Sequence, residues 1–244
     1  MKWPAVVIVV FAIPILASLA GTAVQRAEAK NWWEARRDSS RQAPEPADEQ
    51  RAVLQVYAAR AYGWRGAFGV HTWIAYKPAG AVRYERVEVI GWGVRRGGPA
   101  IRAGYGTPDA YWFGSRPDLL VDLRGQAAAD AIPRVQAAVA RYPWPDQYRV
   151  WPGPNSNTFT AFVAREVPSL GLDLPANAVG KDFLNDAVFG PAPSGTGYQL
   201  SVFGLAGILV AMEEGVEINL LGLNLGLDLN RPALRLPGLG RVGF

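Results

Sequence analysis

The hydrophobic pattern is most extreme at the N-terminus, where no charged residue occurs from Trp3 to Val24. A helix of these twenty-two residues would rise about 33 Å, enough to cross a hydrocarbon core of roughly 30 Å. Lys2, the apolar run and the small-residue pattern Ala27-Glu28-Ala29 also match the layout of a secretory signal. We therefore expect residues 1–29 to be a membrane anchor or a signal segment. The late position of Ala27-Glu28-Ala29 favours a retained anchor.

After this segment the pattern becomes polar and then periodic. Residues 30–48 are charged, contain Pro44 and Pro46, and are predicted to be a linker. From Glu49 to Tyr62 the apolar residues recur at helical spacing, which predicts a short amphipathic helix with the apolar positions Val53, Val56, Tyr57 and Ala61.

Two segments rich in β-branched and aromatic residues, Phe68 to Lys77 and Val82 to Trp92, flank the turn Pro78-Ala79-Gly80-Ala81. This predicts a hairpin with a four-residue loop. That loop would place His71 directly opposite Glu88, with the two side chains on one face of the sheet. A slip of one residue would send Glu88 to the other face.

The remaining pattern predicts loops, two helices and several strands. In chain order these are a loop-rich segment (95–124), a helix (126–142), a strand candidate (148–151), a helix (155–167) and β-favouring segments (198–229). The apolar stretch from Leu200 to Met212 is too short to cross a membrane, so we expect strands there. The predicted fold class is α+β, an antiparallel sheet with helices packed on one face, and residues 49–244 are expected to form a single domain.

Composition removes much of the usual chemistry. The 244 residues include one histidine and no cysteine, so zinc sites built from Cys and His, thiol nucleophiles and disulfides are excluded. The formal charge of +4 is modest and the basic residues are scattered, so we expect no nucleic-acid partner. No metal or cofactor is expected either.

Two segments could carry chemistry, and each also has a purely structural interpretation. His71 lies on a predicted strand, and Asn155, Ser156 and Asn157 lie where a helix begins. Asn and Ser are favoured helix caps, so this turn needs no further explanation. The same geometry would nevertheless place a Ser156 nucleophile beside free backbone N–H groups, with His71 as its base. Trp112 and Phe113, near Gly104-Tyr105-Gly106, could stack against a sugar or peptide or simply pack in a loop.

The order of these segments carries a distant resemblance. His71-x-Trp73 followed by Asn155-Ser156-x-x-Phe159 resembles the circularly permuted papain-like proteins, such as NlpC-type peptidases and lecithin:retinol acyltransferase-like proteins. The resemblance implies a permuted papain-like core in which the histidine precedes a nucleophile at a helix start. His71 would then be the general base, Ser156 the nucleophile and Glu88 the orienting acid, with Asn155 to Asn157 shaping the oxyanion site. Those enzymes have cysteine where this chain has Ser156.

A closer resemblance covers most of the chain after the first segment. It is carried by His71 to Ala81, Gly91-Trp92-Gly93, Trp151 to Phe159 and Gly180-Lys181-Asp182. These segments are similar to DUF3750, a bacterial family known as an uncharacterised domain. This resemblance implies a fold family and no activity.

Three hypotheses of function remain open. The first is a Ser–His hydrolase or acyltransferase that acts on acyl or peptide bonds of the cell envelope. The second is a catalytically inert envelope binding module, and the third is an accessory subunit of a membrane assembly. In each, the N-terminal helix contacts the lipid bilayer, with the domain on the periplasmic or extracytoplasmic side of the inner membrane. Cleavage would make the protein secreted or periplasmic instead.

Overall fold

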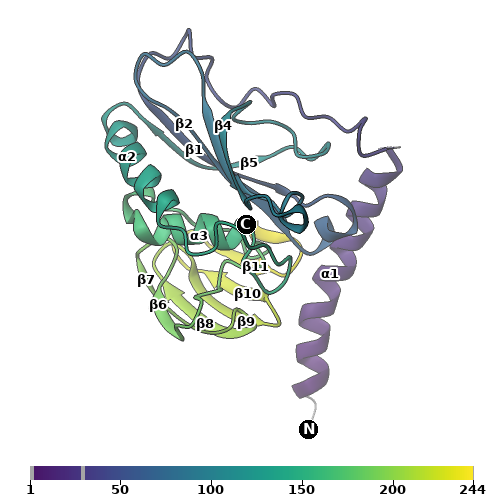
Figure 1. Ribbon diagram of the computed structural model, residues 1–244. Coiled ribbons are helices and arrows are strands. Elements are labelled where there is room, and N and C mark those ends of the chain that lie inside the picture. The colour runs from purple at the N-terminus through teal and green to yellow at the C-terminus, as the bar shows by residue number, and fades with distance from the viewer. Residues whose placement is uncertain (1–2, 29–30, 244) are drawn as a thin grey trace.

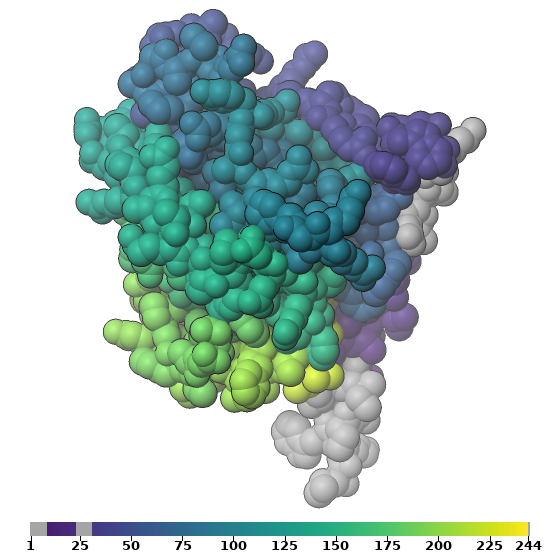
Figure 2. Space-filling model, in the orientation of Figure 1, coloured from purple at the N-terminus to yellow at the C-terminus, as the bar shows by residue number. Residues whose placement is uncertain are grey.

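The structure is a computed structural model that describes residues 3–28 and 31–243 (Figure 1). It is an α+β fold, as the pattern predicts, with two antiparallel sheets where the pattern predicts one. A long N-terminal helix, α1 (Trp3–Glu28), precedes a five-stranded sheet, two helices and a seven-stranded sheet. In the space-filling view the C-terminal sheet forms the lower layer of the body (Figure 2).

The five-stranded sheet has the order β4-β3-β2-β1-β5. Helices α2 and α3 pack on one of its faces, and the main hydrophobic core lies between them and the sheet. The bounds are β1 (Val53–Arg60), β2 (Val70–Lys77), β3 (Glu85–Val89), β4 (Ile101–Tyr105), β5 (Asp118–Arg124), α2 (Gln126–Ala140) and α3 (Ser156–Glu166).

The predicted helix at residues 49–62 is wrong, because this segment contains strand β1. β1 is the strand between β2 and β5, and its residues Val53 to Ala59 are all buried. A strand covered on both faces loses the alternation of apolar and polar residues that identifies a half-buried strand. The apolar spacing that predicts a helix here is a consequence of this complete burial.

The predicted hairpin of β2 and β3 is confirmed, with a longer connection. Residues 78–84 link the strands, and the register pairs Ala75 with Arg86. Glu88 is therefore displaced by two positions from the predicted place opposite His71. A displacement of two residues keeps every side chain on its predicted face.

Both predicted helices are confirmed as α2 and α3, with Pro133 inside α2. The strand candidate at 148–151 is irregular and ends in a bend instead. The loop-rich segment 95–124 contains two short strands, β4 and β5, in addition to its loops.

The seven-stranded sheet is antiparallel and has the order β12-β11-β10-β9-β8-β7-β6. It confirms the strands predicted between 198 and 229 and continues nearly to the C-terminus. Its bounds are β6 (Phe189–Pro191), β7 (Gly197–Val202), β8 (Ala206–Ala211), β9 (Gly215–Leu220), β10 (Leu223–Asp228), β11 (Ala233–Leu236) and β12 (Gly240–Gly243).

Helix α1 contacts the body along one side. The Ser18 hydroxyl donates to the carbonyl of Gly238, and Arg60 donates to both of these oxygens. Helix α1 also packs against the short 3₁₀ helix Gly63–Ala67. Within the part of the chain that the structure describes, no helix combines the length and the apolar character needed to span a bilayer.

Candidate functional site

Helix α3 begins with an N-cap, Asn155, whose side-chain oxygen and nitrogen are both hydrogen-bonded. The Asn155 carboxamide oxygen accepts from the backbone N–H groups of Asn157 and Thr158, at 2.9 and 3.1 Å, which satisfies two of the free donors at the helix start. The Asn155 amide nitrogen donates to the carbonyls of Val150 and Val179. The Asn157 amide donates to the carbonyls of Val70 and Val179. Asn155 and Asn157 therefore connect the start of α3 to β2 and to the segments that precede and follow the helix.

Ser156 is buried within this packed helix start. Its backbone carbonyl accepts from the hydroxyl of Thr72, which also bonds to Asn157 and Thr160. Thr72 thus points from β2 toward α3. Successive side chains of a strand point to opposite faces, so the neighbouring His71 points away from α3.

The structure therefore does not bring His71 and Ser156 together. Among the described residues, His71 makes its side-chain hydrogen bond with Glu88 and no hydrogen bond with Ser156. The predicted Ser–His pair fails because the two groups lie on opposite faces of the five-stranded sheet. The predicted partnership of His71 with Glu88 is formed, at 2.6 Å between Nε2 and Oε2.

Around His71 lies a buried group of charged and aromatic side chains. Glu88 also accepts from Arg86, at 2.9 Å, and the Arg86 guanidinium lies 4.2 Å from the centre of the Trp73 ring. The ring of Trp112 stacks on the imidazole with 3.8 Å between centres. His71 is 5 % exposed as a result.

At both His71 and Glu88 burial and charge have opposite effects on the pKa, and both pKa values are lowered. Burial lowers the pKa of His71 from 6.5, although Glu88 opposes this effect. Burial alone would raise the pKa of Glu88, but the hydrogen bonds and charges of His71 and Arg86 outweigh it and lower that pKa to about 2. The structure therefore favours a neutral imidazole that donates from Nε2 to an ionised carboxylate at neutral pH.

A cleft of about 340 Å³ opens beside this group on the same face of the sheet. The strand register explains its walls, because Glu88 pairs with Arg102 and Arg86 pairs with Gly104 on β4. Three arginines and one carboxylate face the cleft with five aromatic rings: Arg37, Arg86, Arg102 and Glu88, with Trp92, Tyr105, Tyr111, Trp112 and Phe113. A Cβ added at Gly104 would meet nothing within 4 Å, so the wall is open at that position.

The charges of the cleft are unbalanced. Glu88 is already bonded to His71 and Arg86. Among the side chains that the structure describes (residues 9–22 and 31–243), neither Arg37 nor Arg102 forms an ion pair with a carboxylate. The same residues contain no cluster of three or more carboxylate and imidazole groups placed to hold a metal ion. This arrangement suits an anion better than a cation.

The sequence indicates part of this site. Trp112 and Phe113 stand out as candidates for stacking, and the structure places both on the cleft wall, together with Tyr105 of the neighbouring glycine-flanked segment. Arg86 and Arg102 are missed, although Arg86 and Glu88 are two residues apart and so share a face of β3. Arg102 could not be placed beside them, because the pattern does not reveal the strand β4.

Comparison with protein families assigns residues 51–183, which include the start of α3 and every cleft residue named above except Arg37, to a family described as protein of unknown function (DUF3750). The chain belongs to the DUF3750 family. The matched region spans the five-stranded sheet and both of its helices, and Arg37 comes to the cleft from the segment before this region. Neither the curated proteins nor the solved structures include a match, and the papain-like resemblance is not confirmed.

Proposed function

We propose that this DUF3750 protein is a binding module whose cleft takes a ligand with an anionic group attached to a ring. The observation that supports this proposal most strongly is the pair of arginines, Arg37 and Arg102, that face the cleft without a carboxylate partner. An arginine guanidinium presents paired N–H donors that match a carboxylate or a phosphate.

The aromatic side chains support a ring-shaped body for the ligand. Trp92 and Tyr105 are exposed at the cleft, and Trp92 stacks in parallel on Trp112 with 5.8 Å between ring centres. Aromatic faces bind flat apolar surfaces, and an exposed indole ring can cover a sugar or an aromatic ligand. Trp92 and Arg102 line the same cleft, so one ligand would contact the indole with its ring and the guanidinium with its anionic group.

A catalytic function has weaker support. The imidazole lies beneath Trp112 and does not line the cleft, and the Ser156 hydroxyl lies in the helix layer on the other side of the sheet. A hydrolase or acyltransferase would need its nucleophile and base within hydrogen-bond reach of each other. Binding without catalysis fits the arrangement of the described residues better.

We also propose that the protein is attached to a membrane by its N-terminal segment. The uncharged sequence from Trp3 to Val24 supports this, together with the position of α1 along one side of the body. This attachment would place the cleft outside the cytoplasm, where envelope sugars and acids are available as ligands.

Isothermal titration calorimetry with matched ligands tests the binding proposal. Glucuronate and glucose differ by one carboxylate, as benzoate and benzyl alcohol do. We expect the full chain to bind the acids and to bind the neutral partners more weakly. Equal binding of acid and neutral partner, or no binding of any of the four, would contradict the proposal.

Two variants locate the ligand. Arg102→Gln removes a cleft charge, and Gly104→Leu fills open space in the cleft without backbone strain. Both should lose the preference for acids, whereas Arg134→Gln on the exposed side of α2 should keep it. Retained preference in both cleft variants would mean that the acids bind elsewhere.

A further inference from the structure

The seven-stranded sheet has an inverted polarity. A sheet that packs on a protein body normally turns apolar residues inward and polar residues toward water. Here the inward positions include Gln199, Glu217, Asn219, Asn224 and Arg235, which are all buried. The positions between them on the same strands are apolar and lie on the opposite face.

We call that opposite side of the sheet the outer face. Strand pairing brings its residues into register across the sheet, with Leu200 opposite Ile208 and Ile208 opposite Ile218. No charged residue occurs on the outer face, whose side chains are those of Phe189, Pro191, Tyr198, Leu200, Val202, Ala206, Ile208, Val210, Val216, Ile218, Leu220, Leu223, Leu225, Leu227, Leu234, Leu236 and Val242. Contiguous apolar patches of this kind mark interaction surfaces.

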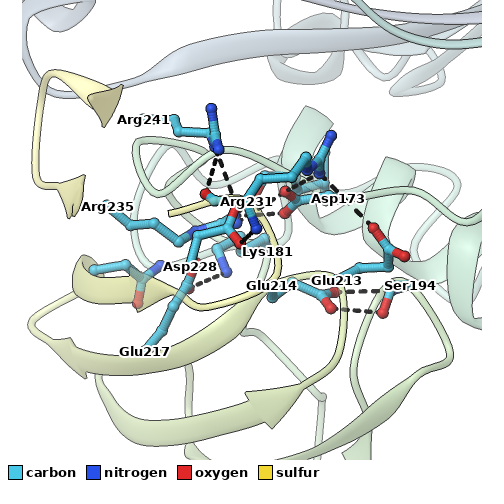
Figure 3. Close-up of polar contacts among 12 residues, drawn as sticks. Asp173, Lys181, Ser194, Glu213, Glu214, Glu217, Asp228, Arg231, Arg235 and Arg241 are labelled. Atoms are coloured by element: carbon cyan, nitrogen blue, oxygen red, sulfur yellow. Dashed lines mark hydrogen bonds and ion pairs between the residues drawn. The ribbon is translucent and has the colours of Figure 1, made fainter. Parts of the chain in front are cut away.

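A buried ionic network fixes which face is turned inward (Figure 3). Glu217 of β9 forms ion pairs with Lys181 and with Arg235, with 2.5 Å between the charged atoms in each pair. Arg235 of β11 also bonds to Asp173, and Glu214 accepts from Ser194. Reversing the sheet would break these ion pairs and leave Lys181 and Asp173 beneath an apolar face without partners, at a large free-energy cost. The exposure of the apolar face is therefore built into the fold.

Two hairpin turns at one end of the seven-stranded sheet each expose a large apolar side chain on a strained backbone. Phe203 and Leu221 adopt φ values of 53° and 56° and are 63 % and 61 % exposed. Glycine or asparagine would occupy this left-handed conformation with less strain. A large apolar side chain that is both strained and exposed indicates that an apolar contact uses it.

The orientation of α1 indicates what that contact is. Helix α1 runs along the side of the body and continues past the seven-stranded sheet toward the N-terminus, on the side to which the outer face is turned (Figure 1). Val9, Ile13 and Leu16 of this helix are exposed as well. A membrane that receives the N-terminal part of α1 would meet the outer face.

We propose that the outer face of the seven-stranded sheet rests on the lipid bilayer. This inference rests on the proposed membrane attachment and extends it, because it assigns the contact to a second surface far from α1 in sequence. The apolar side chains of β7, β8 and β9 and the turn residues Phe203 and Leu221 enter the region between the headgroups and the acyl chains.

The absence of cysteine from the chain makes this contact measurable at single positions. Val210→Cys on the outer face and Val82→Cys in the connection between β2 and β3 are matched, since each replaces a valine that is exposed, by 54 % and 80 %. Each full-length variant is labelled with a nitrobenzoxadiazole fluorophore and mixed with vesicles of phosphatidylcholine and phosphatidylglycerol. A second set of vesicles contains brominated phosphatidylcholine.

We expect blue-shifted emission and bromolipid quenching at position 210 and neither at position 82. Co-flotation with the vesicles reports attachment separately. Co-flotation with water-like emission at 210 would overturn the inference and leave the attachment standing, and failure to float would overturn both. Blue-shifted emission without vesicles, together with a doubled mass by light scattering, would show that a second copy covers the face. If Val210→Cys lowers stability, Leu200→Cys on β7 takes its place.

Discussion

Stability should depend on pH through His71, whose pKa is lowered by burial. A group with a lowered pKa in the folded state binds its proton more readily in the unfolded state. Folding is therefore stabilised above the unfolded pKa of 6.5, and that stability is lost as the pH falls. Glu88 acts in the same direction at lower pH, since its pKa is lowered from 4.5 to about 2.

The melting temperature should fall in two ranges on acidification, first below pH 6.5 and again below pH 4.5. His71→Gln keeps a donor for Glu88 and removes the first titration, so its melting temperature should be flat between neutral pH and about pH 5. Differential scanning calorimetry across pH measures this. A variant that follows the parent curve throughout would show that another group titrates.

Ser156 is expected to be inert as a nucleophile. A fluorophosphonate probe should fail to label the protein, and Ser156→Ala should leave ligand binding in the cleft unchanged. Labelling that disappears in Ser156→Ala and in His71→Ala would contradict the account and restore the hypothesis of a Ser–His enzyme.

The sequence correctly places His71 and Glu88 on one face of the sheet. The observed register of β2 and β3 differs from the predicted one by two residues, and only a shift by an odd number of residues would move Glu88 to the other face. The sequence cannot exclude the pair of His71 with Ser156. That exclusion depends on which face of β2 packs against α3. His71 and Thr72 are both polar, so the sequence does not show which of the two points toward α3. The contacts of Thr72 with Ser156 and Thr160 decide the matter.

Among the elements, α3 depends most on one side chain. Asn155 caps the helix through its oxygen and holds two loop carbonyls through its nitrogen. Asn155→Asp should keep the cap and lose both donated bonds, whereas Asn155→Ala loses all of them. We expect Asn155→Ala to lower the free energy of unfolding by about 2 kcal/mol or more and to exceed the loss in Asn155→Asp. Equal losses in urea unfolding would show that the cap contributes little.

The sequence predicts correctly the elements with a clear period, namely α2, whose buried residues lie on one face, and strands β7 to β10. It also predicts β2, which is buried along its whole length, because β-branched and aromatic residues run up to a turn there. Strand β1 is equally buried but is missed because its apolar residues recur at helical spacing, and β4 is missed because it is short and rich in exposed residues. The inverted polarity of the seven-stranded sheet does not change the alternation of apolar and polar residues along its strands. The sequence therefore predicts the strands but not which face of the sheet is turned inward.

On the scale of the whole molecule, Lys181 joins the C-terminal sheet to the DUF3750 region. Its pKa is raised, because Asp182 and Glu217 outweigh the effect of burial. Lys181→Met should lower the free energy of unfolding by about 3–5 kcal/mol, since it leaves Glu217 with one cationic partner fewer. Arg141→Met breaks the exposed pair with Glu166 and should cost at most about 1 kcal/mol. Similar losses in urea unfolding would contradict a structural role for the network.

The two sheets give the molecule two different surfaces. The five-stranded sheet presents a cationic, aromatic cleft, and the seven-stranded sheet presents an uncharged apolar face. A ligand for the first and a bilayer for the second would make the protein a tethered receptor for an anionic envelope component.

The position of the ligand tests the central claim most directly. The chain has nine tryptophans, and their indole N–H groups give separate signals in a two-dimensional ¹⁵N NMR spectrum. Titration with glucuronate should shift the signals of Trp92 and Trp112 and leave that of Trp151, which bonds to the Leu221 carbonyl away from the cleft, unchanged. Glucose should shift these signals less. Shifts confined to Trp151, or no shift of Trp92 and Trp112 with any of the acids, would contradict the account.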